Sequence, residues 1–181
     1  MLFEKGTTAP AAETVREAAR RSHLVTALEE ADFEEMLNRA AAAGYRVLTA
    51  APNAFPEMIA VVEQQAPTAG RPTYGVLASF KISALANELA RAGAAGWVPH
   101  SRGLLDFDPS DDHLDPMLRG RFDRLRLIVE RKEDATAGKF LVLDAVRVST
   151  LEKELNEATA AGFELVTGGR GRGKLVLVLK R

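Results

Sequence analysis

The chain has 181 residues, of which 46% are hydrophobic and 27% charged, and it contains no cysteine. This composition is typical of a folded globular protein, and the lack of cysteine excludes disulfides, thiolate zinc sites and a cysteine nucleophile. The net charge of -1 gives no general attraction to nucleic acid or anionic membranes, and no apolar run approaches the roughly 20 residues that span a bilayer.

Residues 1–10 lack the charged-then-apolar layout of a signal peptide. We interpret residues 1–21 as an N-terminal extension, in which residues 11–21 have the composition of a short helix. The sequence does not determine the cellular compartment. We expect a soluble protein, either cytoplasmic or exported with a leader that this sequence does not contain. Neither a nucleic acid nor a membrane is expected as a partner.

Three segments align without internal gaps, and each predicts an amphipathic helix that ends at a glycine followed by an aromatic residue. They cover residues 37–45, 89–97 and 155–163. In each, a leucine lies seven residues before the glycine, an alanine four before it, and an apolar residue four before the leucine. This spacing forms one face of an α-helix, and glycine suits the left-handed residue that closes a helix.

Short polar side chains predict where the helices begin. Ser149 with Glu152, and Asp32 with Glu35, have the spacing of a capping box, in which side chains and backbone N–H groups bond reciprocally. Ser83 is the predicted N-cap of the middle helix, without the reciprocal acid.

Each predicted helix is preceded by one strand-like run and followed by two. The predicted first strands are residues 23–28, 74–79 and 140–143, the second strands 45–49 and 163–167, and the last strands 58–63, 124–131 and 174–180. In the run 124–131, Leu125, Leu127 and Val129 alternate with charged residues. This alternation predicts a strand with one buried and one solvent-exposed face.

The sequence therefore predicts an α+β fold of three tandem β-α-β-β repeats, with antiparallel hairpins and one helix per module. The repeats are predicted at residues 22–65, 74–132 and 140–181, and the second carries an insertion at about residues 100–123. A module of about 40 residues is too small to bury a core alone. We therefore expect the modules to share a core or a continuous sheet.

The pattern Leu-Asn-x-Ala-x-x-x-Gly-aromatic, followed by a hairpin ending in Leu-Lys-Arg, resembles a family of small bacterial β-α-β-β modules of unknown function. Repeat 3 carries it best, at residues 155–158, 162–166 and 179–181. Repeat 2 departs most, with Ala90 in place of the asparagine and Pro99 in the strand that follows the helix. The resemblance implies a fold and carries no catalytic residue.

The glycine-rich run at residues 168–174 has the glycine and lysine spacing of a phosphate-binding loop. However, Leu175 stands where a serine or threonine would hold magnesium, and the run leads into a strand. We interpret it as a flexible hairpin tip. Its Arg170, Arg172 and Lys174 are candidates for contact with an anion or an acidic partner.

Four aspartates gather in the insertion of repeat 2, and they are candidate calcium ligands: Asp106, Asp108, Asp111 and Asp112. The run lacks the central glycine and terminal glutamate of an EF-hand loop, and a proline interrupts it. A solvated acidic loop is the favoured interpretation. No metal or other cofactor is predicted.

No catalytic residue is predicted either. His23, His100 and His113 show no metal-ligand spacing, and no Gly-x-Ser-x-Gly motif is present. Residues 22–65 carry seven acids and two bases (2 − 7 = −5), whereas residues 140–181 carry five and seven (7 − 5 = +2). This asymmetry would favour head-to-tail association, although a chance distribution over solvated faces explains it equally well.

The predicted function is that of a non-enzymatic binding or scaffold protein, with an unknown protein partner or self-association. The alternative is a small-ligand-binding or catalytic protein with a pocket between repeats. A deep pocket lined by polar groups from two repeats would favour the alternative. A closed interior would favour the scaffold.

Overall fold

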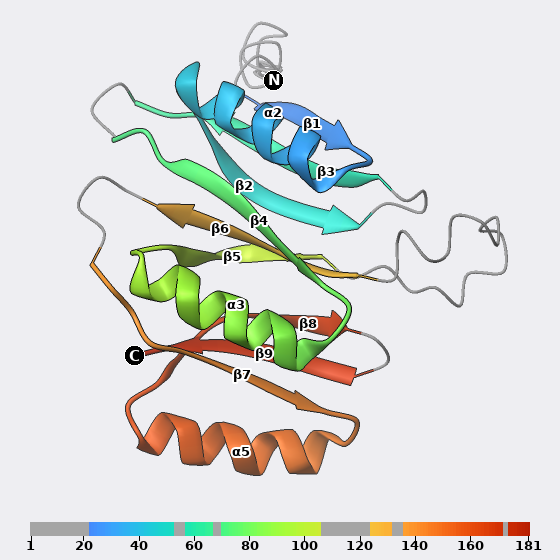
Figure 1. Cartoon of the computed structure of the whole chain (residues 1–181), viewed down its shortest axis with the longest axis vertical. Helices are drawn as coiled ribbons and strands as arrows, with labels where there is room; N and C mark the ends of the chain where they lie inside the picture. The colour runs from blue at the N-terminus through green and yellow to red at the C-terminus, as the bar shows by residue number, and fades with distance from the viewer. Residues whose placement is uncertain (1–21, 53–56, 67–69, 106–123, 132–135, 172–173) are drawn as a thin grey trace, which may run out of the picture.

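The computed structural model describes residues 22–52, 57–66, 70–105, 124–131, 136–171 and 174–181 (Figure 1). These residues form three antiparallel three-stranded sheets, each with one helix beside it. The predicted α+β fold of three β-α-β-β modules is confirmed. In every sheet the last strand of the module lies in the middle, between the first and the second.

The elements follow the same order in each module. Module 1 contains β1 (Ser22–Ala27), α2 (Glu30–Ala42), β2 (Tyr45–Pro52) and β3 (Met58–Gln64). Module 2 contains β4 (Thr73–Ser79), α3 (Ile82–Ala94), β5 (Val98–Leu105) and β6 (Leu125–Arg131). Module 3 contains β7 (Phe140–Ala145), α5 (Val148–Ala160), β8 (Glu164–Gly171) and β9 (Lys174–Lys180).

The glycine after each helix has the predicted left-handed backbone. Its φ is 89° at Gly44, 82° at Gly96 and 84° at Gly162. A side chain is strained in this conformation, because its Cβ approaches the following carbonyl oxygen. Each glycine therefore ends its helix and turns the chain into the next strand.

Substitution of Gly44 by alanine is expected to lower the free energy of unfolding by about 1–2 kcal/mol, through backbone strain alone. A Cβ at Gly44 would meet no atom within 4 Å, so no steric clash adds to the cost. Gly70→Ala is the matched control, because Gly70 also has open space around it and lacks the positive φ. Urea unfolding of both variants measures the difference, and equal stabilities would contradict the strain.

The predicted side-chain caps are wrong, because the helices begin two to three residues earlier than expected. The residues that precede them, Glu29, Lys81 and Arg147, have extended backbones and form no capping side-chain bond. Helix α2 begins instead with the backbone bond from Phe33 N–H to Glu29 O, at 3.0 Å. The two-residue turn that brings the apolar stripe onto the sheet sets the start of each helix.

The second strand of each module has eight residues, and in modules 1 and 3 it is longer than predicted. In module 2, β5 extends to Leu105, which pairs with Arg126 of β6. The insertion therefore begins after Leu105 and not at His100. In module 3, β8 continues to Gly171, which pairs with Lys174 of β9, so most of the glycine-rich run lies in the two strands of the predicted hairpin. Residues 172–173, between the two strands, lie outside the described residues.

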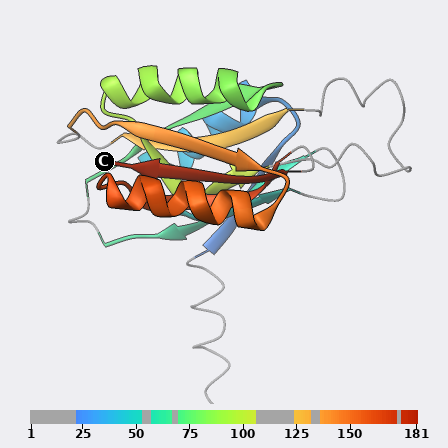
Figure 2. The same cartoon turned by 90° about the horizontal axis from the view of Figure 1, so that it is seen from below.

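The modules stack in chain order, with module 1 at one end and module 3 at the other (Figures 1 and 2). Helix α2 lies against β4 of module 2, and α3 lies against β7 of module 3. Likewise β2 lies beside β5, and β5 beside β8. The sheets stay separate, and the modules share cores as the sequence suggested.

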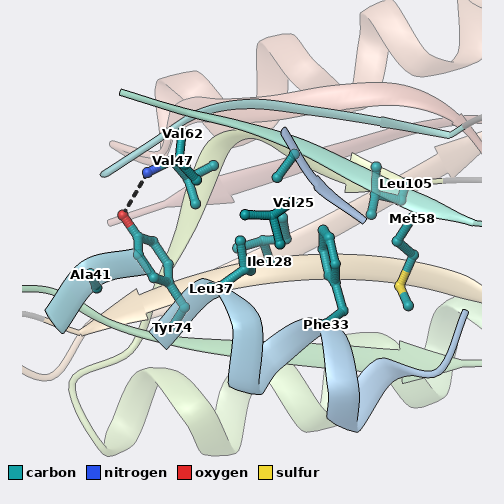
Figure 3. Close-up of a cluster of buried hydrophobic side chains, with 11 residues drawn as sticks. Val25, Phe33, Leu37, Ala41, Val47, Met58, Val62, Tyr74, Leu105 and Ile128 are labelled. Atoms are coloured by element: carbon teal, nitrogen blue, oxygen red, sulfur yellow. Dashed lines mark hydrogen bonds between the residues drawn. The ribbon is translucent and has the colours of Figure 1, made fainter. Parts of the chain in front are cut away.

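Each shared core combines one module with the back of the next sheet. The first core joins α2 and the first sheet to Tyr74, Leu105 and Ile128 of module 2 (Figure 3). The second core joins α3 and β6 to Val176 and Val178 of module 3. Apolar burial between neighbouring modules therefore adds to the burial within each module, as in other repeat proteins.

The predicted solvent-exposed face of β6 is wrong, because module 1 covers it. Leu125, Leu127 and Val129 pack in the second core, whereas Ile128 packs in the first. Arg126, on the same face as Ile128, has a side chain that is 1% exposed and binds Glu30 Oε1 of α2 through its Nε at 2.9 Å. A buried charge needs such a partner, so this ion pair fixes module 2 against α2.

Candidate functional site

Two of the three predicted anion-contact residues lie in the described structure, at the adjoining ends of β8 and β9. Arg170 is exposed near the end of β8. Lys174 is the first residue of β9, and its Nζ binds Asp144 Oδ2 at 2.5 Å, so a carboxylate already balances its charge. Arg172 lies outside the described residues.

Gly168 and Gly169 of this run stand where other elements pack closely against β8. A Cβ at Gly168 would lie 2.6 Å from Leu177 Cδ2, and one at Gly169 would lie 3.2 Å from Leu104 Cδ2 in module 2. Gly169 therefore allows β8 to approach β5 closely.

The aspartates Asp106, Asp108, Asp111 and Asp112 lie outside the described residues. In the part of the chain that the structure does describe, no group of three or more histidine, aspartate or glutamate side chains is placed to hold a metal ion.

Polar groups from two modules meet where β2 lies beside β5. His100 of β5 bonds through its Nε2 to Val47 O of β2 at 3.0 Å, and its Nδ1 accepts a bond from Arg102 N–H at 3.3 Å. Because Nδ1 accepts, Nε2 carries the proton and donates to the carbonyl. Both ring nitrogens of this buried histidine are therefore engaged, Nε2 across the module boundary and Nδ1 within β5.

Tyr74 joins the same two modules from β4. Its hydroxyl accepts a hydrogen bond from Val47 N–H at 2.9 Å (Figure 3), and burial raises its pKa to about 12. Nearby, Arg46 of β2 binds Glu130 Oε1 of β6 at 3.4 Å. The phenol stays neutral over the physiological range, so it serves here as a structural hydrogen-bonding group.

Acidification is expected to destabilise the protein through His100. Burial lowers the pKa of His100 in the folded state below its ordinary value of 6.5, so the unfolded chain binds the proton first as the pH falls. The stability that neutral His100 contributes is full above pH 6.5 and decreases as the pH falls toward the lowered value.

Urea unfolding at about pH 7.5 and about pH 5.5 measures this effect, with His100→Gln as the control. The glutamine amide keeps a donor for Val47 O but does not titrate in this range. Acidification should cost the wild type more free energy than it costs the variant. Equal losses would show that His100 does not couple stability to pH.

A second arrangement lies on α2, whose side chains bind the outer edge of β4. Asn38 Nδ2 donates to Tyr74 O at 2.9 Å, and Tyr74 N–H donates to Asn38 Oδ1 at 2.8 Å. Four residues earlier on the helix, Glu34 Oε2 accepts a bond from Val76 N–H at 3.0 Å. Two side chains thus satisfy three backbone groups that an edge strand would otherwise leave unpaired.

The next helix, α3, meets its neighbouring strand differently. Ala86 and Ala90 occupy the positions of Glu34 and Asn38, so these bonds are missing. The backbones lie closer instead: a Cβ on Gly93 would lie 2.5 Å from Phe140 Cδ2, and Gly138 N–H donates to Gly93 O at 3.0 Å. The loss of asparagine in repeat 2 therefore accompanies tighter packing.

The third helix restores the first arrangement. Counted back from the glycine that ends each helix, Glu152 and Asn156 of α5 correspond to Glu34 and Asn38 of α2. Both are exposed on α5, the helix at the end of the stack (Figure 2). They line a shallow groove with Ser149, Lys153, Glu157 and Ala160. We call this groove, defined by these six residues, the trailing face.

The opposite end of the stack presents the outer surface of the first sheet. Leu24 is 68% exposed, and Ile59 and Val61 are half-buried. At the positions of Val61 in modules 2 and 3, Ile128 and Val178 are fully buried by the preceding module. We call the surface formed by Ser22, Leu24, Thr26, Ile59 and Val61 the leading face.

The sequence pattern contained a signal for the trailing face, because asparagine follows leucine in repeats 1 and 3 but not in repeat 2. What the asparagine binds was not readable, since Asn38 and Tyr74 are 36 residues apart. The role of His100 was missed for the same reason, because its partner Val47 lies 53 residues away.

Comparisons of the chain with protein-family models, with curated proteins and with solved structures gave no match. The resemblance to a family of small bacterial modules of unknown function therefore stays a prediction. Within the described ranges, no helix is long and apolar enough to cross a membrane.

Proposed function

We propose that this chain is a non-enzymatic binding or scaffold protein whose trailing face binds an exposed edge strand of a partner. One observation carries the proposal. Glu152 and Asn156 repeat the side chains with which α2 holds β4, yet they are exposed at the end of the stack.

The chemistry of these two side chains suits a strand edge. An asparagine amide offers a donor and an acceptor at once, so it can bond the C=O and N–H of one residue in an extended chain, as Asn38 does at Tyr74. A glutamate accepts from the N–H two residues further along, as Glu34 does at Val76. Backbone groups supply the bonds, so the face would select extended structure more than sequence.

Affinity purification from the source organism tests the proposal, with the tagged protein compared with its Glu152→Ala/Asn156→Ala variant. We expect specific co-purifying chains, a copy of this protein included, to be lost from the variant. Thr150→Ala is the matched control, because Thr150 is an exposed residue of α5 that lies outside the groove. Retention of every bound chain by the double variant would contradict the proposal.

A small-ligand site is the second candidate, and one observation favours it. A hollow between modules 1 and 2 is lined by polar groups from both, among them Arg46, Glu63, His100 and Arg102. Two arginines at one opening would suit a small anion. Isothermal titration with phosphate and with small dicarboxylates tests this function. Binding that Arg102→Ala abolishes would support it, and the absence of heat would contradict it.

A further inference from the structure

We propose that the strand held by the trailing face is β1 of a second copy of this chain, so that copies associate head to tail and continue the stack of modules. This inference rests on the proposed function and names its partner. It follows from comparing the two interfaces inside the chain with the two ends of the stack.

Inside the chain, every interface joins the helix side of one module to the outer surface of the next sheet. Helix α2 lies against β4, and α3 lies against β7. By the same rule α5 would lie against the first strand of a following module. In a second copy that strand is β1, which lies at the edge of its sheet in the order β1-β3-β2.

The hydrogen-bonding groups of the two ends correspond position by position. Ser22 and Leu24 of β1 stand where Tyr74 and Val76 stand in β4, both counted from the helix-ending glycine. Asn156 of one copy would therefore bond the N–H and C=O of Ser22 in the other. Glu152 would accept from Leu24 N–H, as Glu34 does from Val76 N–H.

The facing side chains at the two ends also allow a close approach of helix and strand. In the first interface Ala41 packs with the bulky Tyr74, and in the second Gly93 lies against Phe140. At the ends of the stack the helix carries the larger Thr159, and the strand carries the small Ser22. At the ends of the stack the larger side chain is therefore on the helix, and neither side chain is bulky enough to keep the helix away from the strand.

Apolar surface at both ends would be covered by this contact. Leu24 is 68% exposed, and Ile59 and Val61 are half-buried on the leading face. At the other end Leu175 and Leu177 are half-buried, whereas Leu125 and Leu127 at the same positions of module 2 are fully buried. Removing apolar area from water supplies a driving force for association. A contact between two different faces of one chain generates either rings or open chains of copies.

Sedimentation velocity of the purified full chain over a wide concentration range tests the inference. The wild type should form dimers and larger species as its concentration rises. The Glu152→Ala/Asn156→Ala variant should weaken association roughly tenfold or more, because it removes three intermolecular hydrogen bonds. Leu24→Asp, at the opposite end, should weaken it comparably. Thr150→Ala should match the wild type, and circular dichroism should confirm that all variants are folded.

A mixing experiment then separates head-to-tail from face-to-face association. The double variant keeps a leading face, and Leu24→Asp keeps a trailing face. Mixed together, the two should form a one-to-one heterodimer that grows no further, because only one productive contact remains. Association of each variant with itself at wild-type strength would overturn the inference, as would a mixture that stays monomeric.

The two proposals fail in distinguishable ways. A wild-type chain that stays monomeric at high concentration would overturn self-association. If Glu152→Ala/Asn156→Ala still lost a different partner in the affinity purification, the trailing face would remain a strand-binding site. If the double variant lost nothing in either experiment, both proposals would be overturned.

Discussion

Removal of module 3, by ending the chain before Phe140, is expected to leave a product that does not fold as a cooperative monomer. Phe140 and Val142, with Val176 and Val178 of β9, cover the core around α3 and β6. Their loss exposes Leu85, Leu89 and Leu127 to water. Each exposed side chain of this size costs about 1.5–3 kcal/mol, against a total stability of about 5–15 kcal/mol for a typical domain.

Urea unfolding followed by circular dichroism, together with sedimentation of the shortened chain, measures this outcome. We expect either aggregation or a broad transition of low amplitude. A monomer with a sharp, cooperative transition would show that the first two modules have a sufficient core of their own. The result bears directly on whether the modules are independent domains or parts of one stack.

Truncation of equivalent leucines in modules 2 and 3 is expected to give unequal losses of stability. Leu127 of β6 and Leu177 of β9 occupy the same repeat position, but only Leu127 is fully buried. Leu127→Ala should cost about 2–5 kcal/mol, because it leaves a cavity in a packed core. Leu177→Ala should cost about 1–2 kcal/mol, since part of its surface is already in water.

Denaturant titration at low protein concentration, where association is minimal, gives the comparison for isolated copies. Equal losses would mean that the end module is as well covered as the middle one. If copies associate through the trailing face, the cost of Leu177→Ala should rise with protein concentration. The cost of Leu127→Ala should rise less, because that site is covered within the chain.

The sequence predicted the content of each module because its signals are local. The leucine stripe that ends at Gly44, Gly96 or Gly162 specifies a helix and its stop within a dozen residues, and all three glycines have the expected positive φ. The capping boxes were also local signals, yet they failed. The turn from strand to helix has to place the apolar stripe on the sheet, and this requirement outweighs a single side-chain bond.

The candidate site could be predicted only in part from the sequence. Arg170 and Lys174 were selected for their charge, but Asp144 engages Lys174 and the glycines around Arg170 serve close packing. The asparagine at positions 38 and 156 was visible as a pattern without a partner. Its meaning depends on a strand of another module, and no spacing within one repeat encodes that contact.

The sequence by itself determined the three modules, their order of elements and the glycine that ends each helix, because these depend on side-chain periodicity and on backbone sterics. The tertiary structure alone decided how the modules meet. It buries both faces of β6, pairs Arg126 with Glu30 across a module boundary and leaves Asn156 exposed at the end of the stack. The physical reason is that burial is a non-local property: a residue is covered by whatever element packs on it, and here that element belongs to another module.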